Sequence, residues 1–218
     1  MQYLLAISLA LFALKTSSCT PKGHKVQQLS TEEMLQDTSL RRAYFASGCF
    51  WCVEAVYESV TGIKEVISGY SGGSKETATY EQVSTGLTGH AEAVEVIYDP
   101  KQTNYSTLLG VFFDSHDPTT LNRQGPDAGT QYRSIIFYQN DAEKILAQNY
   151  IASLENFGTY DKGEITTEIS PLSAFYPAED YHQNYESINP EQPYVRSVST
   201  PRLNKFKAKH PELLKKEH

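Results

Sequence analysis

The stretch from residue 41 to residue 70, RRAYFASGCFWCVEAVYESVTGIKEVISGY, combines three patterns of regular structure in succession. Ser47-Gly48 interrupts the first pattern and Thr61-Gly62 ends the second, because these residues favour turns and helix ends. The stretch therefore predicts a strand, a helix and a second strand, over residues 43–46, 49–60 and 63–70. Cys49 is expected at the junction between the first strand and the helix.

The same alternation of patterns continues along the chain. Asn104 and the pair Asn140 and Glu143 carry side chains that cap helix N-termini, so a helix is expected after each asparagine. In the second of these helices, the apolar residues predicted to share one buried face are Ala142, Ile145, Leu146, Tyr150 and Leu154. Further strands are expected over residues 92–98, 131–138 and 165–169.

This order of elements, β-α-β-β-α-β-α-β, predicts an α+β fold. We expect a two-layer sandwich with helices packed on a mixed sheet, built on a ferredoxin-like β-α-β-β-α-β core with a C-terminal extension. The chain has 218 residues, of which 39% are hydrophobic, which is enough for one sizeable core. The expected organisation is a leader and tether, a catalytic domain and a basic tail, over residues 1–40, 41–200 and 201–218.

The charge distribution bears on possible partners. The formal net charge is −7, although the segment from Arg202 to the end has six Lys or Arg against two Glu. An acidic body argues against nucleic-acid binding, which requires a basic face to neutralise phosphates. The basic segment has the mixed composition of a solvated chain end rather than of a binding site.

The first twenty residues resemble an export signal. Leu4 to Leu14 form a run of 11 largely apolar residues, which is too short to cross a bilayer as a helix. Small residues lead from this run to Cys19, as in the lipobox of bacterial lipoproteins. We expect export to the periplasm or membrane, with Cys19 as the lipidation site and a polar tether after it. Lys15 and the absence of a basic residue before the run leave a cytoplasmic location with an unprocessed N-terminus as the alternative.

The sequence around Cys49 has the chemistry of a reactive thiol. A cysteine in the first turn of a helix lies at the positive end of the helix dipole, which favours the thiolate, so we expect Cys49 to be an activated nucleophile. Phe50 and Trp51 could line an apolar wall beside it. Cys52 follows one helical turn later, and a separation of roughly 5 Å between the two Cα atoms permits a local disulfide.

Three other interpretations of these cysteines are open. A structural zinc site requires four ligands, and no second Cys pair or close Cys/His pair completes one, so no metal is expected. A Cys-x-x-Cys pair at a helix start is also typical of thioredoxin-like thiol-disulfide oxidoreductases, although two bulky aromatics between the cysteines would hinder contact with protein disulfides. The third interpretation is a surface-anchored binding protein without catalytic activity.

Four separate blocks of the sequence resemble a known family. The residues Gly48-Cys49-Phe50-Trp51 are similar to the signature of the A-class methionine sulfoxide reductases. The other blocks are Tyr80 with residues 86–94, residues 116–134, and residues 178–185 followed by Asn189-Pro190. They run in the family's order from about Tyr44 to Pro190. The resemblance implies an enzyme that reduces the S epimer of methionine sulfoxide, free or in peptides, to methionine.

The resemblance also implies roles for individual residues. Cys49 would attack the sulfoxide sulfur, and Glu92 would supply the proton with which the oxygen leaves. A general thiol-disulfide oxidoreductase or a binding protein needs no such acid, so Glu92 distinguishes the interpretations. An apolar pocket would keep this carboxyl neutral by raising its pKa. The residues expected to bind the substrate are Phe50, Trp51, Tyr80, Asp127 and Tyr132, of which the tyrosine hydroxyls would hold the sulfoxide oxygen and Asp127 would order water or the substrate backbone.

The remaining expectations concern support and recycling. His182 and Tyr185 match family positions and are expected to support the site rather than to react. Attack by Cys49 produces a sulfenic acid, which a second thiol resolves as a disulfide. Many family members use a cysteine near the C-terminus, but no cysteine follows Cys52 here. Cys52 is therefore the expected resolving cysteine, and a thioredoxin-like dithiol rather than a bound cofactor is the expected electron donor.

Overall fold

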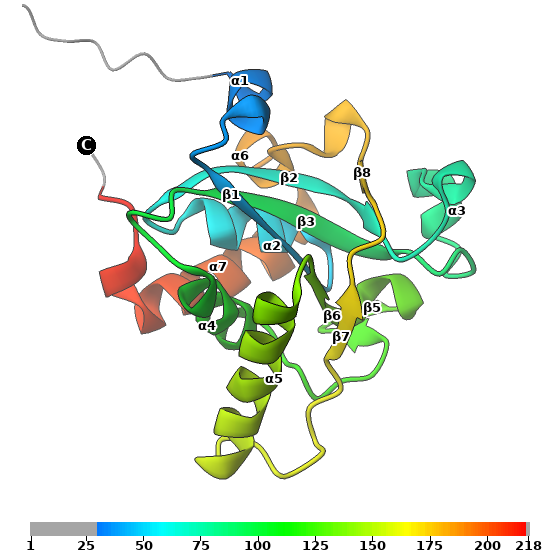
Figure 1. The fold of residues 1–218 in the computed structure, drawn as a ribbon. Helices are drawn as coiled ribbons and strands as arrows, with labels where there is room; N and C mark the ends of the chain where they lie inside the picture. Colours follow the sequence, from blue (N-terminus) through cyan, green and yellow to red (C-terminus); the bar gives the residue numbers. More distant parts are fainter. Residues whose placement is uncertain (1–29, 217–218) are drawn as a thin grey trace, which may run out of the picture.

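The computed structural model describes residues 30–216, which fold around one six-stranded sheet (Figure 1). The strands lie in the order β7-β6-β1-β3-β2-β8. Their bounds are β1 (Arg41–Ser47), β2 (Ile63–Ser71), β3 (Ala91–Tyr98), β6 (Ser134–Tyr138), β7 (Glu168–Pro171) and β8 (Phe175–Pro177). A separate two-stranded ribbon consists of β4 (Arg123–Gln124) and β5 (Asp127–Ala128).

The middle of the sheet has the predicted ferredoxin-like arrangement. The four strands β6, β1, β3 and β2 are neighbours in that order and pair antiparallel. The edges are extended by β7, which pairs parallel with β6, and by β8, which pairs antiparallel with β2. The sheet is therefore mixed, and the α+β prediction with its β-α-β-β-α-β core is confirmed.

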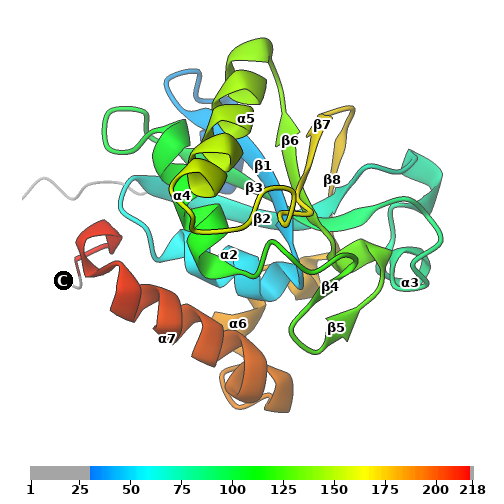
Figure 2. The ribbon, with the colours of Figure 1, turned by 90° about the horizontal axis from the view of Figure 1, so that it is seen from below.

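The helices lie mainly on one side of this sheet, as Figure 2 shows for α2, α4 and α7. Seven α-helices are described: α1 (Thr31–Gln36), α2 (Phe50–Glu58), α3 (Tyr80–Val83), α4 (Tyr105–Ser115), α5 (Asp141–Asn156), α6 (Tyr185–Ile188) and α7 (Thr200–Lys209). Single turns of 3-10 helix occur at Lys75–Thr77, Thr130–Tyr132, Asp180–His182 and Pro211–Leu213, and Val195–Ser199 forms a π-helical turn.

Alternation along the strands divides the buried residues between the two faces of the sheet. Phe45 of β1 points to the helical side, where its ring stacks on Tyr57 of α2 and contacts Phe112 of α4. Tyr44, the preceding residue, belongs to a smaller cluster on the opposite face, where Phe175 packs against it. The larger cluster fixes α2 on the sheet and thereby fixes Cys49, which lies at its N-terminus.

The predicted helix starts are present, but one predicted face is only partly correct, because Tyr150 and Leu154 of α5 pack on the core while Ala142 is exposed. The side chains of Asn104 and Asn140 accept hydrogen bonds from backbone N–H groups in the first turns of α4 and α5. In α5, Ile145 and Leu146 are exposed, and Ala147 is the residue that is fully buried. The helix packs against α4 and against the strands β6 and β7 at the edge of the sheet. The side of α5 that is buried is therefore the side that meets these elements, which the apolar pattern alone does not identify.

Both predicted appendages differ from expectation within the described residues. The segment predicted as a solvated tail from residue 201 contains most of α7, which packs on α2 and α4 and buries Phe206 in the main core. The segment predicted as a tether includes α1, where Met34 is buried. Cys19 and the apolar run before it lie outside the described residues. Within residues 30–216, none of the helices has the length and apolar character needed to cross a membrane.

Candidate active site

The turn between β1 and α2 places the reactive cysteine. Gly48 has a φ of +93°, a backbone conformation that residues other than glycine rarely adopt. A Cβ atom at this position would lie 2.6 Å from Gln124 Cβ. Cys49 follows as the N-cap of α2. Its carbonyl oxygen accepts hydrogen bonds from the N–H groups of Cys52 and Val53, at 3.1 and 3.3 Å.

A cavity of about 270 Å³ opens beside this turn and unites all the predicted catalytic and substrate-binding side chains except Cys52. It is lined by Cys49, Phe50, Trp51, Tyr80, Glu92, Asp127, Tyr132, Gln192 and Tyr194. The prediction did not include Gln192 and Tyr194. They follow closely after Asn189-Pro190, where the recognised blocks end, so only the continuation of the family pattern past residue 190 could have revealed them.

Glu92 reaches the cavity from the interior of the sheet. It lies on β3 opposite Tyr70 of β2, and only 2% of its surface is exposed. Its Oε2 atom accepts a hydrogen bond from the Phe50 N–H at 3.1 Å, which holds the carboxyl at the start of α2. Burial raises the pKa of Glu92 to about 8, and the nearby Asp127 carboxylate adds to the effect. The carboxyl is therefore protonated at neutral pH, as the prediction required.

The ionisation of Cys49 differs from the prediction. Burial raises the pKa of the Cys49 thiol above its usual range, and the hydrogen bond to Cys52 acts in the same direction. The helix N-terminus was expected to favour the thiolate, but removal of the sulfur from water outweighs the helix dipole at this position. Cys49 is thus a neutral thiol in the resting enzyme.

Two tyrosine hydroxyls line the cavity as neutral donors. Burial raises the pKa of Tyr80 and of Tyr132, and the neighbouring Glu92 and Cys49 add to the effect. Within residues 30–216, neither hydroxyl is engaged in a hydrogen bond. Both are therefore available to a substrate oxygen in the cavity.

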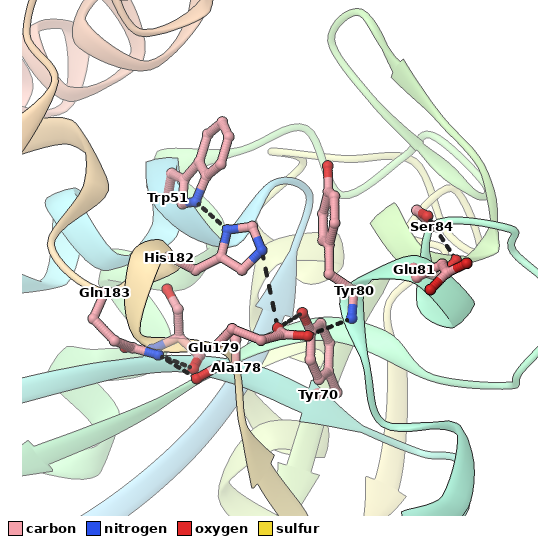
Figure 3. Close-up of polar contacts among 10 residues, drawn as sticks. Trp51, Tyr70, Tyr80, Glu81, Ser84, Ala178, Glu179, His182 and Gln183 are labelled. Atoms are coloured by element: carbon pink, nitrogen blue, oxygen red, sulfur yellow. Dashed lines mark hydrogen bonds and ion pairs between the residues drawn. The ribbon is translucent and has the colours of Figure 1, made fainter.

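His182 holds the aromatic wall of the site, as Figure 3 shows. The Trp51 indole N–H donates to His182 Nδ1 at 3.1 Å, which places the histidine proton on Nε2, 4.0 Å from Glu179 Oε2. Although burial opposes ionisation of Glu179, hydrogen bonds from the Tyr80 N–H and the Tyr70 hydroxyl hold its pKa below the usual value. The Glu179 carboxylate therefore anchors the backbone of Tyr80 and lies near His182 without a hydrogen bond to it.

Tyr185 completes this wall. Its ring stacks on Trp51 with the ring centroids 3.7 Å apart and the planes 7° from parallel. Trp51 is thus fixed on one face by Tyr185 and at its edge by His182. His182 and Tyr185 both contact Trp51, and neither lines the cavity.

Asp127 is hydrogen-bonded to a tyrosine that the prediction did not include. The Tyr194 hydroxyl donates to Asp127 Oδ2 at 2.5 Å, and the same hydroxyl oxygen lies 3.9 Å from the Cys52 sulfur. Asp127 therefore positions Tyr194 in addition to lining the cavity. Burial raises the pKa of Asp127, while the hydrogen bond from Tyr194 and the Arg202 charge oppose this effect.

Cys52 belongs to a second and larger cavity. This space of about 800 Å³ lies between α7, the β4–β5 ribbon and the end of α4, and Cys52 and Arg202 are among its lining residues. Tyr194 and Asp127 line both cavities, so this pair lies between the space at Cys49 and the space at Cys52. The two thiols thus face different cavities although one helical turn separates them.

Comparison with known proteins agrees with this geometry. The sequence model described as peptide methionine sulfoxide reductase matches residues 41–214. The chain belongs to the peptide methionine sulfoxide reductase family. It is 51% identical over 176 residues to the peptide methionine sulfoxide reductase MsrA of Acinetobacter baumannii strain AYE, an alignment that covers 81% of this chain and 99% of that protein. The MsrA 2 protein of Synechocystis is 50% identical over 175 residues, which cover 80% of this chain and 81% of that one.

Solved structures of the family have the same fold. Mxr1 from Saccharomyces cerevisiae in its reduced form superimposes with a TM-score of 0.63 at 36% identity, over 71% of this chain and 89% of that one. Methionine sulfoxide reductase A of Corynebacterium diphtheriae gives a TM-score of 0.62 at 35% identity, over 71% and 77% of the two chains. This member of the methionine sulfoxide reductase family is an oxidoreductase that reduces methionine sulfoxide. A general thiol-disulfide oxidoreductase is not favoured.

Proposed function

We propose that Cys49 is the nucleophile of this reductase and Glu92 its general acid. The observation that carries the proposal is the shared cavity, in which a buried, protonated carboxyl lies beside the thiol at the start of α2. Phe50 and Trp51 supply an apolar surface suited to the methyl group of the substrate. The free hydroxyls of Tyr80 and Tyr132 are suited to hold the sulfoxide oxygen.

The reductive step follows from these protonation states. Cys49 sulfur forms a bond to the sulfoxide sulfur while Glu92 donates its proton to the oxygen, and the carboxylate accepts the proton that the thiol loses. The S–O bond of the substrate and the new S–S bond then break as the hydroxyl group passes to Cys49, which becomes a sulfenic acid, and methionine is released. The substrate sulfur is reduced by two electrons and the Cys49 sulfur is oxidised by two. Glu92 ends the step protonated.

We propose that Cys52 resolves the sulfenic acid. It lies one helical turn from Cys49, and within residues 30–216 these two are the cysteines present, both free. Formation of a Cys49–Cys52 disulfide releases water. A thioredoxin-like dithiol would then reduce the disulfide by exchange, because the chemistry requires two electrons and two protons and no redox group other than the thiols is needed.

An assay with the resolved sulfoxide epimers and dithiothreitol tests the reaction. We expect turnover of the S epimer and essentially none of the R epimer, which is the stereochemistry that the resemblance to the A-class reductases implies. Cys49→Ser should abolish the reaction, whereas Cys19→Ser should leave the turnover of the purified enzyme unchanged. Equal turnover of both epimers would contradict the proposed substrate.

A second experiment separates the two thiols. Cys52→Ser should still form one methionine per enzyme molecule with excess sulfoxide, but lose about tenfold or more of its thioredoxin-supported turnover, because the sulfenic acid then lacks its local partner. Peptide mapping of the substrate-oxidised enzyme should identify a Cys49–Cys52 disulfide. A persistent sulfenic acid on Cys49 with an alkylatable Cys52 would exclude Cys52 as the resolving residue.

A further inference from the structure

Arg202 of α7 reaches the junction between β1 and α2. Its Nε donates to the Ser115 carbonyl oxygen at 2.6 Å, and one terminal nitrogen donates to the Ser47 hydroxyl at 3.2 Å. The other terminal nitrogen lies 3.6 Å from the point that a Cβ atom on Gly48 would occupy. The guanidinium is therefore held against the turn that carries Cys49.

The positive charge of Arg202 has no carboxylate partner within ion-pair distance among residues 30–216. Its two anchors, Ser115 and Ser47, are neutral acceptors. Arg202 shares the 800 Å³ cavity with Cys52, whose sulfur is a neighbour able to take up negative charge. A half-buried cation bound only by neutral groups stabilises an anion at such a neighbour.

We propose that Arg202 is a positioning residue that keeps Cys52 ionised for its attack on the oxidised Cys49. The inference rests on the proposed resolving role of Cys52 and adds the group that prepares this thiol. The titratable, charged and hydroxyl groups that surround Cys52 come from five elements or segments: Cys49, Glu92, Asp127, Tyr194, Ser199 and Arg202. Arg202 is the cation among them.

The remaining charged groups of the larger cavity do not replace it. Burial lowers the pKa of His116 to about 3, and the Arg202 charge acts in the same direction, so His116 is neutral. Lys205 is exposed one turn further along α7. The acidic groups on the cavity wall, Asp114, Asp117 and Glu164, oppose a thiolate rather than support it.

The titration of the thiol agrees with this geometry. The hydrogen bond from Cys49 is the largest cause that lowers the pKa of Cys52, to about 6, and the Arg202 charge adds to it while burial opposes both. Cys49 ceases to be a thiol when it is oxidised. Arg202 remains unchanged throughout the cycle, so its charge is present when the resolving attack occurs.

The resolving step then balances without a further reactant. The Cys52 thiolate attacks the Cys49 sulfur, the new S–S bond forms and the S–O bond breaks, and the departing hydroxide takes the proton of the Glu92 carboxyl to leave as water. Cys52 is oxidised as the sulfenic sulfur is reduced. The charge of Arg202 stabilises the Cys52 thiolate, which is the nucleophile of this step. It has no part in the preceding attack of Cys49 on methionine sulfoxide.

The test measures the two steps separately in the full chain carrying Cys19→Ser. Rapid mixing with excess methionine S-sulfoxide, followed by quenching with an alkylating reagent, gives the rates of methionine release and of Cys49–Cys52 disulfide formation. Arg202→Met should leave methionine release within about threefold of the parent. For each unit by which the pKa of Cys52 rises, the thiolate fraction at low pH falls tenfold and the nucleophilicity of the thiolate rises about threefold, so disulfide formation slows by about threefold.

The pH profile separates this role from a structural one. Disulfide formation in Arg202→Met should be slower than in the parent at pH 6. It should be no slower at pH 9, where Cys52 is ionised in both proteins and the more basic thiolate, that of the variant, is the better nucleophile. Arg202→Lys should restore most of the rate at pH 6, and Ser47→Ala, which removes one anchor and keeps the charge, should leave the midpoint of the profile unchanged.

The outcomes distinguish the inference from the proposed function on which it rests. If the parent enzyme forms no Cys49–Cys52 disulfide, the resolving role of Cys52 fails. If the parent forms it but Arg202→Met has the same pH midpoint, or is slowed equally at every pH, the role of Arg202 fails. Circular dichroism of each variant establishes that it is folded.

Discussion

Glu92 has to carry a proton to act as an acid, and its surroundings make this possible at neutral pH. Burial raises the pKa of Glu92 to about 8, above the usual value of a glutamate. The neutral form is therefore complete well below pH 8 and is lost as the pH rises through that value. Since Cys49 is also a neutral thiol in this range, we expect the single-turnover rate of methionine formation to be level between pH 6 and 7 and to fall above pH 8.

Replacement of Glu92 by glutamine tests the same proton. Glu92→Gln keeps a hydrogen-bond acceptor for the Phe50 N–H but supplies no acidic proton, so the reductive step should slow by about 10²-fold or more. The fall above pH 8 should disappear with it. A matched change at another glutamate, Glu81→Gln on the exposed side of α3, should alter neither the rate nor the profile. A variant within twofold of the parent would remove Glu92 from the mechanism.

Single residues differ in how far the sequence alone predicts them. Cys49, Glu92, Tyr80 and Tyr132 belong to blocks with a recognisable pattern, and the structure brings them into one cavity. The raised pKa of Cys49 was not predictable in the same way, because it depends on how much water the folded chain excludes from the sulfur. Tyr194 and Arg202 were missed because they lie after Asn189-Pro190, where the recognised blocks of the family end. The segment that contains them has few apolar residues and no cysteine.

At the scale of elements, patterns with strong caps and turns were predictable and weakly apolar ones were not. The β-α-β-β-α-β order follows from clear turn residues and capping asparagines, and the strand pairing agrees with it. In α7, Leu203 and Phe206 are the large apolar residues among four basic ones, so its sequence is typical of a solvated segment. The helix is nevertheless packed, because these two side chains meet an apolar surface on α2 and α4.

The contribution of α7 to stability is measurable. Phe206 is 1% exposed within the main core, so Phe206→Ala should lower the free energy of unfolding by about 3–5 kcal/mol, which combines lost apolar burial with the remaining cavity. Urea denaturation at pH 7 gives this value. The exposed neighbour Asn204 provides the control, because Asn204→Ala should change it by no more than about 0.5 kcal/mol. Equal effects of the two substitutions would mean that α7 does not pack on the core in solution.

At the scale of the whole molecule, the site depends on parts of the chain that are far apart in sequence. Cys49 and Cys52 come from the first helix of the core, Glu92 from its central strand, and Tyr194 and Arg202 from the C-terminal region. The two cavities meet at Tyr194 and Asp127, so the C-terminal region closes the site around Cys49 on one side and holds the charge near Cys52 on the other. Every group proposed to act in catalysis lies between residues 49 and 202. We therefore expect that the N-terminal segment takes no part in the reaction.

We propose that the N-terminal segment exports the protein and anchors it by a lipid on Cys19. The proposal rests on the largely apolar run from Leu4 to Leu14 and the small residues before Cys19. Full-length protein expressed in bacteria should be found in the membrane fraction, and its N-terminal peptide should begin at a lipid-modified Cys19. Cys19→Ser should release the protein from membranes while Thr20→Ser should not, and because the catalytic groups lie elsewhere, both variants should keep full reductase activity. An intact Met1 with an unmodified Cys19 in protein recovered from cells would refute export, and the enzyme would then act on methionine sulfoxide in the cytoplasm.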